Sequence, residues 1–251
     1  MSGVAWRLQC HDSLPSTSDA VIEAAEAGEP AGLAILARRQ TRGRGSRGRS
    51  WVEPPEGNLA VTVLLRPDDM LDVPAVWPFV AGLALHDALV EAAGIAERDV
   101  HRLILKWPND IMLDGRKLAG ILVERGVSDG VTAWLAIGFG ANLVLAPSGP
   151  GISAAALTSL GVCCSPEHVA HRLLAALDKW QDALRDRGFG AIRSTWLERA
   201  HPVGTEIRCV VSGISRSGRF SGLAEDGALL LQDAGNLLRV DTGHILMPAE
   251  G

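Results

Sequence analysis

An unusual run of arginines and glycines, QTRGRGSRGRSWVEPPEG at residues 40–57, holds the first side chains that could do chemistry. Guanidinium groups form paired hydrogen bonds with phosphate and carboxylate oxygens, and glycines let the backbone approach an anion closely. We therefore expect a flexible loop that binds a nucleotide triphosphate or an acyl-adenylate. Its arginines are Arg42, Arg44, Arg47 and Arg49. A solvated basic linker and an RNA-binding tract remain alternatives, although such tracts usually occur in longer low-complexity runs.

Two phosphate-binding fingerprints overlap the same segment. Residues 43–48 fit the dinucleotide pattern G-x-G-x-x-G, and residues 43–50 nearly fit the P-loop, with Arg49 in place of its lysine. Both patterns need a helix directly afterwards, because the helix N-terminus holds the phosphate. Pro54 and Pro55 oppose such a helix, so we reject both interpretations.

A second group of charged residues lies in KWPND (106–110) and RKLAGIL (116–122). Lys106 ends the apolar run RLILKW, which is typical of a strand, and Pro108 favours extended geometry in the residue before it. Lys106 alone would be interpreted as a solvent lysine at a strand end, and Lys117 as an ordinary hairpin lysine. The motifs that surround them make both lysines candidates for contact with an anion.

Periodicity and turn signals predict the elements that position these residues. The polar residues 16–19 begin a helix that Gly28 ends, and Gly94 ends another. Asp-Gly pairs at 114–115 and 129–130 predict tight hairpins, so the sheet is at least partly antiparallel. We expect strands at 33–38, 58–66 and 102–107, and helices at 20–27, 74–93, 166–187 and 189–199.

After His201-Pro202 the composition shifts to short strands separated by glycine and aspartate turns. The sequence thus predicts an α+β fold with a mixed β-sheet packed by helices at residues 1–200, and a small β-barrel-like unit at 201–251.

Composition excludes several classes of protein. A net charge of -5 argues against a surface that binds nucleic acid throughout. Apolar runs are far shorter than the roughly 20 residues that cross a bilayer, and no secretory signal is visible. Four cysteines lack a Cys-x-x-Cys pair, so we expect reduced thiols in a cytoplasmic protein. We interpret His168 and His171 as helix residues and not as metal ligands.

Five blocks of this sequence resemble the bacterial biotin protein ligases, in the order and approximate spacing of that family. The resemblance covers essentially the whole chain, and KWPND with RKLAGIL is its most specific part. The blocks are Ser16-Thr17-Ser18, Gln40 with residues 43–51, residues 106–110, residues 116–122, and Gly138-x-Gly140-x-Asn142.

The resemblance implies a class II synthetase-like catalytic domain followed by an SH3-like β-barrel. It also implies the short form without an N-terminal DNA-binding domain, because the first block begins at Ser16. The implied reaction uses ATP, biotin and Mg²⁺: the biotin carboxylate attacks the α-phosphate, and a lysine of a biotin carboxyl carrier protein then attacks the adenylate. We expect no DNA or membrane partner, and a monomer or homodimer.

The resemblance also implies roles for individual residues. Lys106 and Arg44 are the expected catalytic cations, since they would offset the repulsion between a carboxylate and a triphosphate. Asp110 is a candidate Mg²⁺ ligand. The implied biotin-binding residues are Ser16, Thr17, Ser18, Gln40, Arg44, Gly45, Ser46 and Lys106. The implied nucleotide-binding residues are Arg47, Arg49, Trp51, Asn109, Lys117 and Asn142.

Two alternatives stay open from the sequence. Lipoate protein ligases use the same chemistry on another acid, and an RNA-binding module would also use the Arg/Gly segment. The other blocks and the acidic balance favour biotin ligation. The chain departs from several relatives at Ser18, where they carry asparagine, and at Ser46, where they carry arginine. How tightly the protein retains the adenylate intermediate is therefore not determined by the resemblance.

Overall fold

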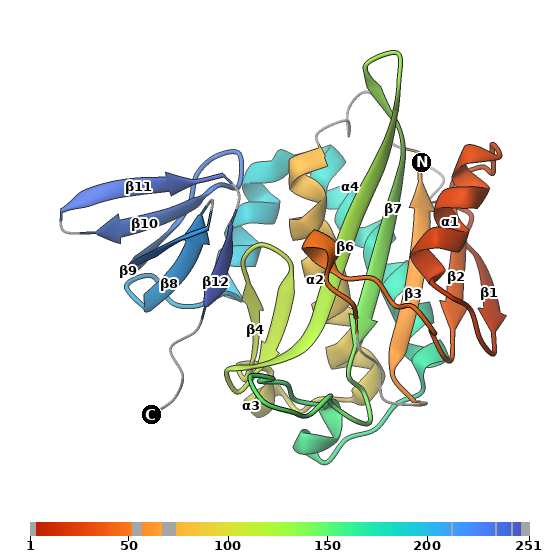
Figure 1. The fold of residues 1–251 in the computed structure, drawn as a ribbon, viewed down its shortest axis with the longest axis horizontal. Coiled ribbons are helices and arrows are strands. Elements are labelled where there is room, and N and C mark those ends of the chain that lie inside the picture. The colour runs from red at the N-terminus through yellow and green to blue at the C-terminus, as the bar shows by residue number, and fades with distance from the viewer. Residues whose placement is uncertain are drawn as a thin grey trace.

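A computed structural model describes residues 4–51, 57–66, 74–211, 213–233, 235–241 and 243–246. A large sheet packed by helices occupies one side of the molecule, and a second, smaller sheet lies beside it (Figure 1). None of the helices in these ranges has both the length and the apolar composition needed to span a membrane.

The large sheet has seven strands in the order β1-β2-β3-β7-β6-β5-β4. Only the β1–β2 pair is parallel, so the predicted mixed sheet is confirmed. β2 and β3 are buried along their whole length, as their continuous apolar sequences require. The strands are β1 (Arg7–His11), β2 (Leu33–Ala37), β3 (Leu59–Leu65), β4 (Leu103–Lys106), β5 (Asp110–Leu113), β6 (Arg116–Ser128) and β7 (Val131–Ala141).

Tight turns join β5 to β6 and β6 to β7, as the Asp-Gly pairs predict. Asp114 and Gly115 have φ of 49° and 73°, and Asp129 and Gly130 have φ of 52° and 83°. Positive φ at both central residues is the type I′ geometry that matches strand twist. The β6–β7 hairpin, whose register shifts between Gly126 and Val127, projects beyond the rest of the sheet (Figure 1).

Helices cover the two faces of this sheet unequally. α1 (Thr17–Glu26) begins at its N-cap Ser16, whose hydroxyl accepts from the Asp19 N–H at 3.3 Å, and packs on β2, β3 and β7. α2 (Trp77–Ala93) and α4 (Pro166–Glu198) pack against each other on the opposite face (Figure 1). α3 (Glu97–Val100) is a single turn before β4. On the face of the sheet where α1 packs, none of the described helices covers β6.

The long α4 is two helices that meet at Gly188, as the sequence predicts. Gly188 has φ 70° and ψ 177°, a backbone conformation that side chains with a Cβ avoid. The second part packs Trp196 against Phe79 of α2, with ring centroids 5.4 Å apart.

The smaller sheet is antiparallel, with the order β11-β10-β9-β8-β12. The sequence predicts an SH3-like barrel here, but within the described residues no ladder joins the edge strands β11 and β12, which have five and three residues. The domain boundary at residue 201 stays a prediction, since both sheets share one hydrophobic core. The strands are β8 (Glu206–Val211), β9 (Ile214–Leu223), β10 (Leu229–Asp233), β11 (Asn236–Val240) and β12 (His244–Leu246).

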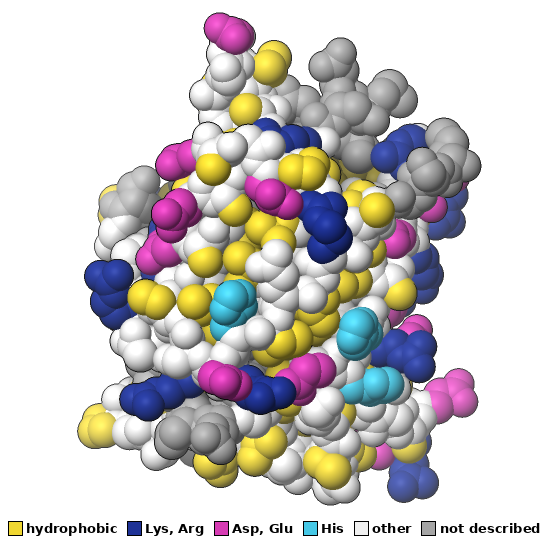
Figure 2. Space-filling model, turned by 90° about the vertical axis from the view of Figure 1, so that its right-hand side faces the viewer, with side chains coloured by type: hydrophobic (Ala, Val, Ile, Leu, Met, Phe, Trp, Pro, Cys, Tyr) yellow, Lys and Arg dark blue, Asp and Glu magenta, His cyan; other side chains and the backbone are white. Residues whose placement is uncertain are grey.

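The edge of the large sheet at β1 is protected by charge. Figure 2 shows this side of the molecule, where hydrophobic side chains gather in the middle and acidic and basic ones surround them. Arg7 pairs with Glu29 at 3.0 Å, and Arg38 pairs with Asp12 and Glu167 at 3.1 Å each. Charged side chains beside an edge strand oppose pairing with a foreign strand.

We predict opposite effects of alanine at two neighbouring glycines of α4. At Gly188 and at Gly190 an added Cβ meets no atom within 4 Å. The two substitutions therefore test only the backbone conformation. Gly188→Ala should lower the free energy of unfolding by about 1–3 kcal/mol because of its positive φ. Gly190→Ala, the matched control, should raise it by up to about 1 kcal/mol. Urea unfolding measures both, and equal effects would contradict the break at Gly188.

Candidate active site

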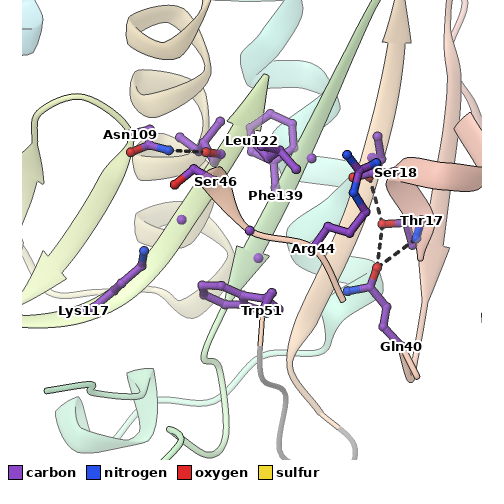
Figure 3. A pocket seen from close by; sticks show the side chains of 16 residues that line it. Thr17, Ser18, Gln40, Arg44, Ser46, Trp51, Asn109, Lys117, Leu122 and Phe139 are labelled. Atoms are coloured by element: carbon purple, nitrogen blue, oxygen red, sulfur yellow. Dashed lines mark hydrogen bonds between the residues drawn. The ribbon is translucent and has the colours of Figure 1, made fainter. Parts of the chain in front are cut away.

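A pocket opens on the α1 face, where the Arg/Gly segment crosses β6 and β7 (Figure 3). Its walls combine polar side chains from the start of α1, backbone of the two strands and an aromatic ring. The lining residues are Thr17, Ser18, Gln40, Arg44, Gly45, Ser46, Trp51, Thr62, Asn109, Lys117, Gly120, Ile121, Leu122, Gly138, Phe139 and Gly140.

One end of the pocket is a network of short polar side chains. The Gln40 Oε1 atom accepts from the Thr17 N–H at 2.8 Å and from its hydroxyl at 3.1 Å. The Thr62 hydroxyl lies 2.9 Å from the Thr17 hydroxyl and 3.3 Å from that of Ser18. Thr17, Ser18 and Thr62 are almost fully buried. This end can therefore match several donors and acceptors on a compact polar ring.

The floor of the pocket is bare backbone. Gly120 of β6 and Gly140 of β7 face each other across the two strands, and the Trp51 ring lies on both. An added Cβ would stand 2.5 Å from the ring at Gly140 and 3.3 Å from it at Gly120. The indole Nε1 is buried and has no hydrogen-bond partner among the described residues. The glycines thus allow an aromatic ring to lie flat against the sheet.

The opposite end carries positive charge. Lys117 Nζ lies 2.5 Å from Asp110 Oδ1 and 5.6 Å from the centre of the Trp51 ring. Lys106 Nζ approaches the other carboxylate oxygen at 3.8 Å. Burial lowers the pKa of Lys106, and the charges of Lys117 and Arg49 lower it further while Asp110 opposes them. Two of the three lysines of the chain thus share one carboxylate.

Strand register explains this cluster. Lys106 of β4 pairs with Asp110 of β5, Asp110 with Gly120 of β6, and Gly120 with Gly140 of β7. Paired residues point to the same face of a sheet and lie about 5 Å apart. The four paired residues therefore form one row across the strands, and the Trp51 ring covers the two glycines of this row.

Residues 40–51 of the Arg/Gly segment contain several backbone hydrogen bonds, and the predicted flexibility of the segment stays a prediction. It folds back on itself through a bridge between Arg44 and Ser50 and a hydrogen bond of 2.8 Å from the Gly45 N–H to the Arg49 carbonyl. A 3-10 turn (Ser46–Gly48) closes it. The Arg44 guanidinium binds Asp19 at 2.7 Å and also Glu124. Arg44 therefore fastens the segment to α1 and β6.

The structure brings nine of the predicted residues into the pocket wall and leaves others outside it. Ser16 serves as the N-cap of α1. Asn142 donates to the Ala155 carbonyl at 3.1 Å, which ties the end of β7 to the following loop. Lys106 and Asp110 do not line the pocket, and Arg49 lines an adjoining groove. The side chain of Arg47 and residues 52–56, which hold the two prolines, lie outside the described residues.

Sequence reasoning missed Thr62 and the apolar wall of Leu122 and Phe139. The signal for Thr62 is a lone hydroxyl inside the buried run LAVTVLL. A buried threonine needs a hydrogen-bond partner, so its neighbours must be polar.

The carboxylate of Asp110 does not fit a metal ion in this arrangement. Both of its oxygens face lysine ammonium groups. No group of three or more His, Cys, Asp or Glu side chains with metal-binding geometry occurs in the described ranges.

Taken together, the polar end and the positively charged end of the pocket can hold a molecule with a polar ring at one end and an anion at the other.

Comparison with known proteins agrees with this chemistry. A model of the Biotin/lipoate A/B protein ligase family matches residues 11–142. The biotin--[acetyl-CoA-carboxylase] ligase of Paracoccus denitrificans is 42% identical over 205 residues, which make up 79% of this chain and 83% of that protein.

Two solved structures share the fold. Biotin protein ligase from Aquifex aeolicus in complex with biotin and ATP has a TM-score of 0.79 at 26% identity, covering 96% of this chain and 97% of that chain. The ligase from Leishmania major in complex with biotinyl-5-AMP has a TM-score of 0.65 at 27% identity, covering 96% and 99%. The chain therefore belongs to the biotin/lipoate A/B protein ligase family.

Proposed function

We propose that this chain is an ATP-dependent biotin protein ligase, which forms biotinyl-5'-AMP and then transfers biotin to a lysine of a carrier protein. The observation that carries the proposal is the polarity of the pocket, with hydroxyl and amide groups at one end and Lys117 at the other (Figure 3). Biotin has the same polarity. Its ureido ring offers two N–H donors and a carbonyl, and its chain ends in a carboxylate.

In the first half-reaction the biotin carboxylate attacks the α-phosphate of ATP and displaces pyrophosphate. A carboxylic acid is already ionised at neutral pH, so no general base is needed. The barrier is repulsion between two anions. One cation about 4 Å away offsets roughly 4 kcal/mol at an effective dielectric of 20.

Lys117 is the cation that the geometry favours for this task, since it lines the pocket with 35% of its side chain exposed. The side chain of Lys106 is only 13% exposed, and Arg44 is paired with two carboxylates. Lys106 and Arg44 stay predictions as catalytic residues.

The nucleotide would lie along a groove that adjoins the pocket on the outer side of the Arg/Gly segment. Arg42, Arg49 and Trp51 line this groove, so it offers charge for a triphosphate and a ring for stacking. Mg²⁺ would be bound mainly by the triphosphate, because it usually keeps few protein ligands beside substrate phosphates. Nucleotide contacts of Arg47, Asn109 and Asn142 stay predictions.

The second half-reaction needs an acceptor lysine. The Paracoccus denitrificans relative is a biotin--[acetyl-CoA-carboxylase] ligase. We propose the biotin carboxyl carrier protein of that enzyme, or of another biotin-dependent carboxylase, as the partner. A monomeric or homodimeric state, the absence of DNA binding and a cytoplasmic location stay predictions.

We predict that the purified protein catalyses biotin-dependent ATP–pyrophosphate exchange. Lys117→Gln should reduce it at least about 100-fold, because the charge that offsets anion repulsion is lost. Lys179→Gln is the control, since this third lysine binds Asp87 on α2. Exchange with lipoate alone would show a lipoate ligase. Exchange with neither acid would refute the proposal.

A second prediction concerns Thr62. Thr62→Val keeps the shape of the side chain but removes the hydroxyl shared by Thr17 and Ser18. Biotin affinity measured by calorimetry should fall about tenfold, the effect of one lost hydrogen bond in a buried network. Thr158→Val is the control, because its hydroxyl donates to the Val144 carbonyl away from the pocket. Unchanged affinity in Thr62→Val would remove this network from the biotin site.

A further inference from the structure

A second cavity lies along the outer edge of β4, apart from the candidate active site. β4 is the last strand of the large sheet, and α2, α4 and the residues that follow α4 line the cavity with it. The cavity has a volume of about 530 Å³ and shares no lining residue with the active-site pocket. Small-molecule sites usually measure roughly 300–1,000 Å³, so this cavity is large enough for a ligand of its own.

One wall of the cavity is a charge cluster around Asp87 of α2. The Asp87 carboxylate accepts from Arg199 Nη1 at 2.6 Å, and its second oxygen accepts from Lys179 Nζ and Trp180 Nε1 at 2.9 Å each. Burial opposes ionisation of Asp87, but hydrogen bonds from these donors lower its pKa, so it is charged. Burial lowers the pKa of the neighbouring His86 to about 4, which leaves it neutral. The cluster therefore carries one net positive charge.

The guanidinium of Arg199 has an unused edge. Its Nη1 atom donates to Asp87 and, at 3.3 Å, to Nδ1 of His86. The N–H groups of Nε and Nη2 donate to no acceptor in the part of the chain that the structure describes. Two such parallel N–H groups match the two oxygens of one carboxylate. The side chain is 26% exposed and its guanidinium carbon lies 5.6 Å from the centre of the Trp180 ring, which fixes its position.

The rest of the cavity selects among anions. Leu103 and Ile104 of β4 and Val90 of α2 give it an apolar wall. Glu91 and Glu198 also line it, and both are exposed. These two carboxylates repel a polyanion such as a nucleotide triphosphate, whereas a single negative charge is balanced by the cluster. The chemistry of the cavity thus fits one carboxylate joined to an apolar chain.

We propose that this cavity binds an amphipathic monocarboxylate of the class of medium-chain fatty acids, with its carboxylate on Arg199 and its alkyl chain along Leu103 and Ile104. The carboxylate supplies the counter-ion that the Asp87 cluster lacks, and the chain removes apolar side chains from water. The inference goes beyond the proposed function and does not depend on it.

Calorimetry on the full chain tests the proposal with octanoate as the probe. Octanoate should bind with a Kd of roughly 0.1–1 mM, as expected for a ligand of this size. 1-Octanol, which has the same chain without the charge, should bind at least about tenfold more weakly because the charge-assisted hydrogen bonds are lost. No binding of octanoate, or equal binding of the two probes, would overturn the proposal.

Two substitutions test the two halves of the site. Arg199→Met should weaken octanoate binding at least about tenfold, and Arg185→Met is its control, since Arg185 pairs with Asp182 outside the cavity. Val90→Phe leaves the charge cluster intact and fills the cavity, so it should weaken binding by a similar factor. Its control is Val131→Phe, at an exposed position of β7. Unchanged affinity in Val90→Phe would refute the site even if Arg199→Met does not fold.

The place of binding must also be separated from the active-site pocket, which is proposed to hold another carboxylate. Neither Lys117→Gln nor saturating biotin should change the octanoate Kd by more than about twofold. An NMR cross-relaxation signal should join the octanoate chain to the methyl groups of Ile104. Competition by biotin, or a signal to Leu122 in place of Ile104, would place the probe in the active-site pocket and overturn the inference. Octanoate bound at Ile104 without any biotin-dependent exchange would instead leave this inference standing and refute the proposed function.

Discussion

Backbone register across β4, β5, β6 and β7 is the constraint on which the site depends. It brings Lys106, Asp110, Gly120 and Gly140 into one row on one face of the sheet. A slip of one residue in any of these pairings would turn half of the row to the other face, into the layer of α2 and α4. The turn at Asp114 sets the first pairs of β5 and β6, and a register shift between Ile111 and Met112 then brings Asp110 opposite Gly120.

The two faces of the sheet have different roles, because the helices cover them unequally. On the α2 and α4 face, buried side chains form a continuous core with the second sheet. On the other face α1 is short and covers only one side, so that the row of charged and bare positions stays accessible. Because the glycines leave room for Trp51, the Arg/Gly segment can lie close to the strands while Arg42 and Arg49 line the groove on its outer side.

The segment KWPND illustrates how neighbouring residues serve different parts of the fold. Lys106 belongs to the charged row, whereas the Trp107 ring is buried and its Nε1 donates at 3.0 Å to the carbonyl of Gly227, between β9 and β10 of the smaller sheet. Asn109 donates to the Ile121 carbonyl at 2.6 Å and thereby fastens the segment to β6. The smaller sheet is therefore in direct contact with the strand that carries part of the site.

Local chemistry in the sequence determined the helix caps, the Asp-Gly hairpins, the break near Gly188 and the blocks that carry the family resemblance, since each depends on a few adjacent residues. Thr17, Gln40 and Trp51 were assigned to the site from those blocks. Only the tertiary structure decided which lysine faces the pocket, because strand register sets the distances between Asp110 and its two partners. Thr62 also joined the site through packing between segments far apart in the chain, which no local pattern encodes.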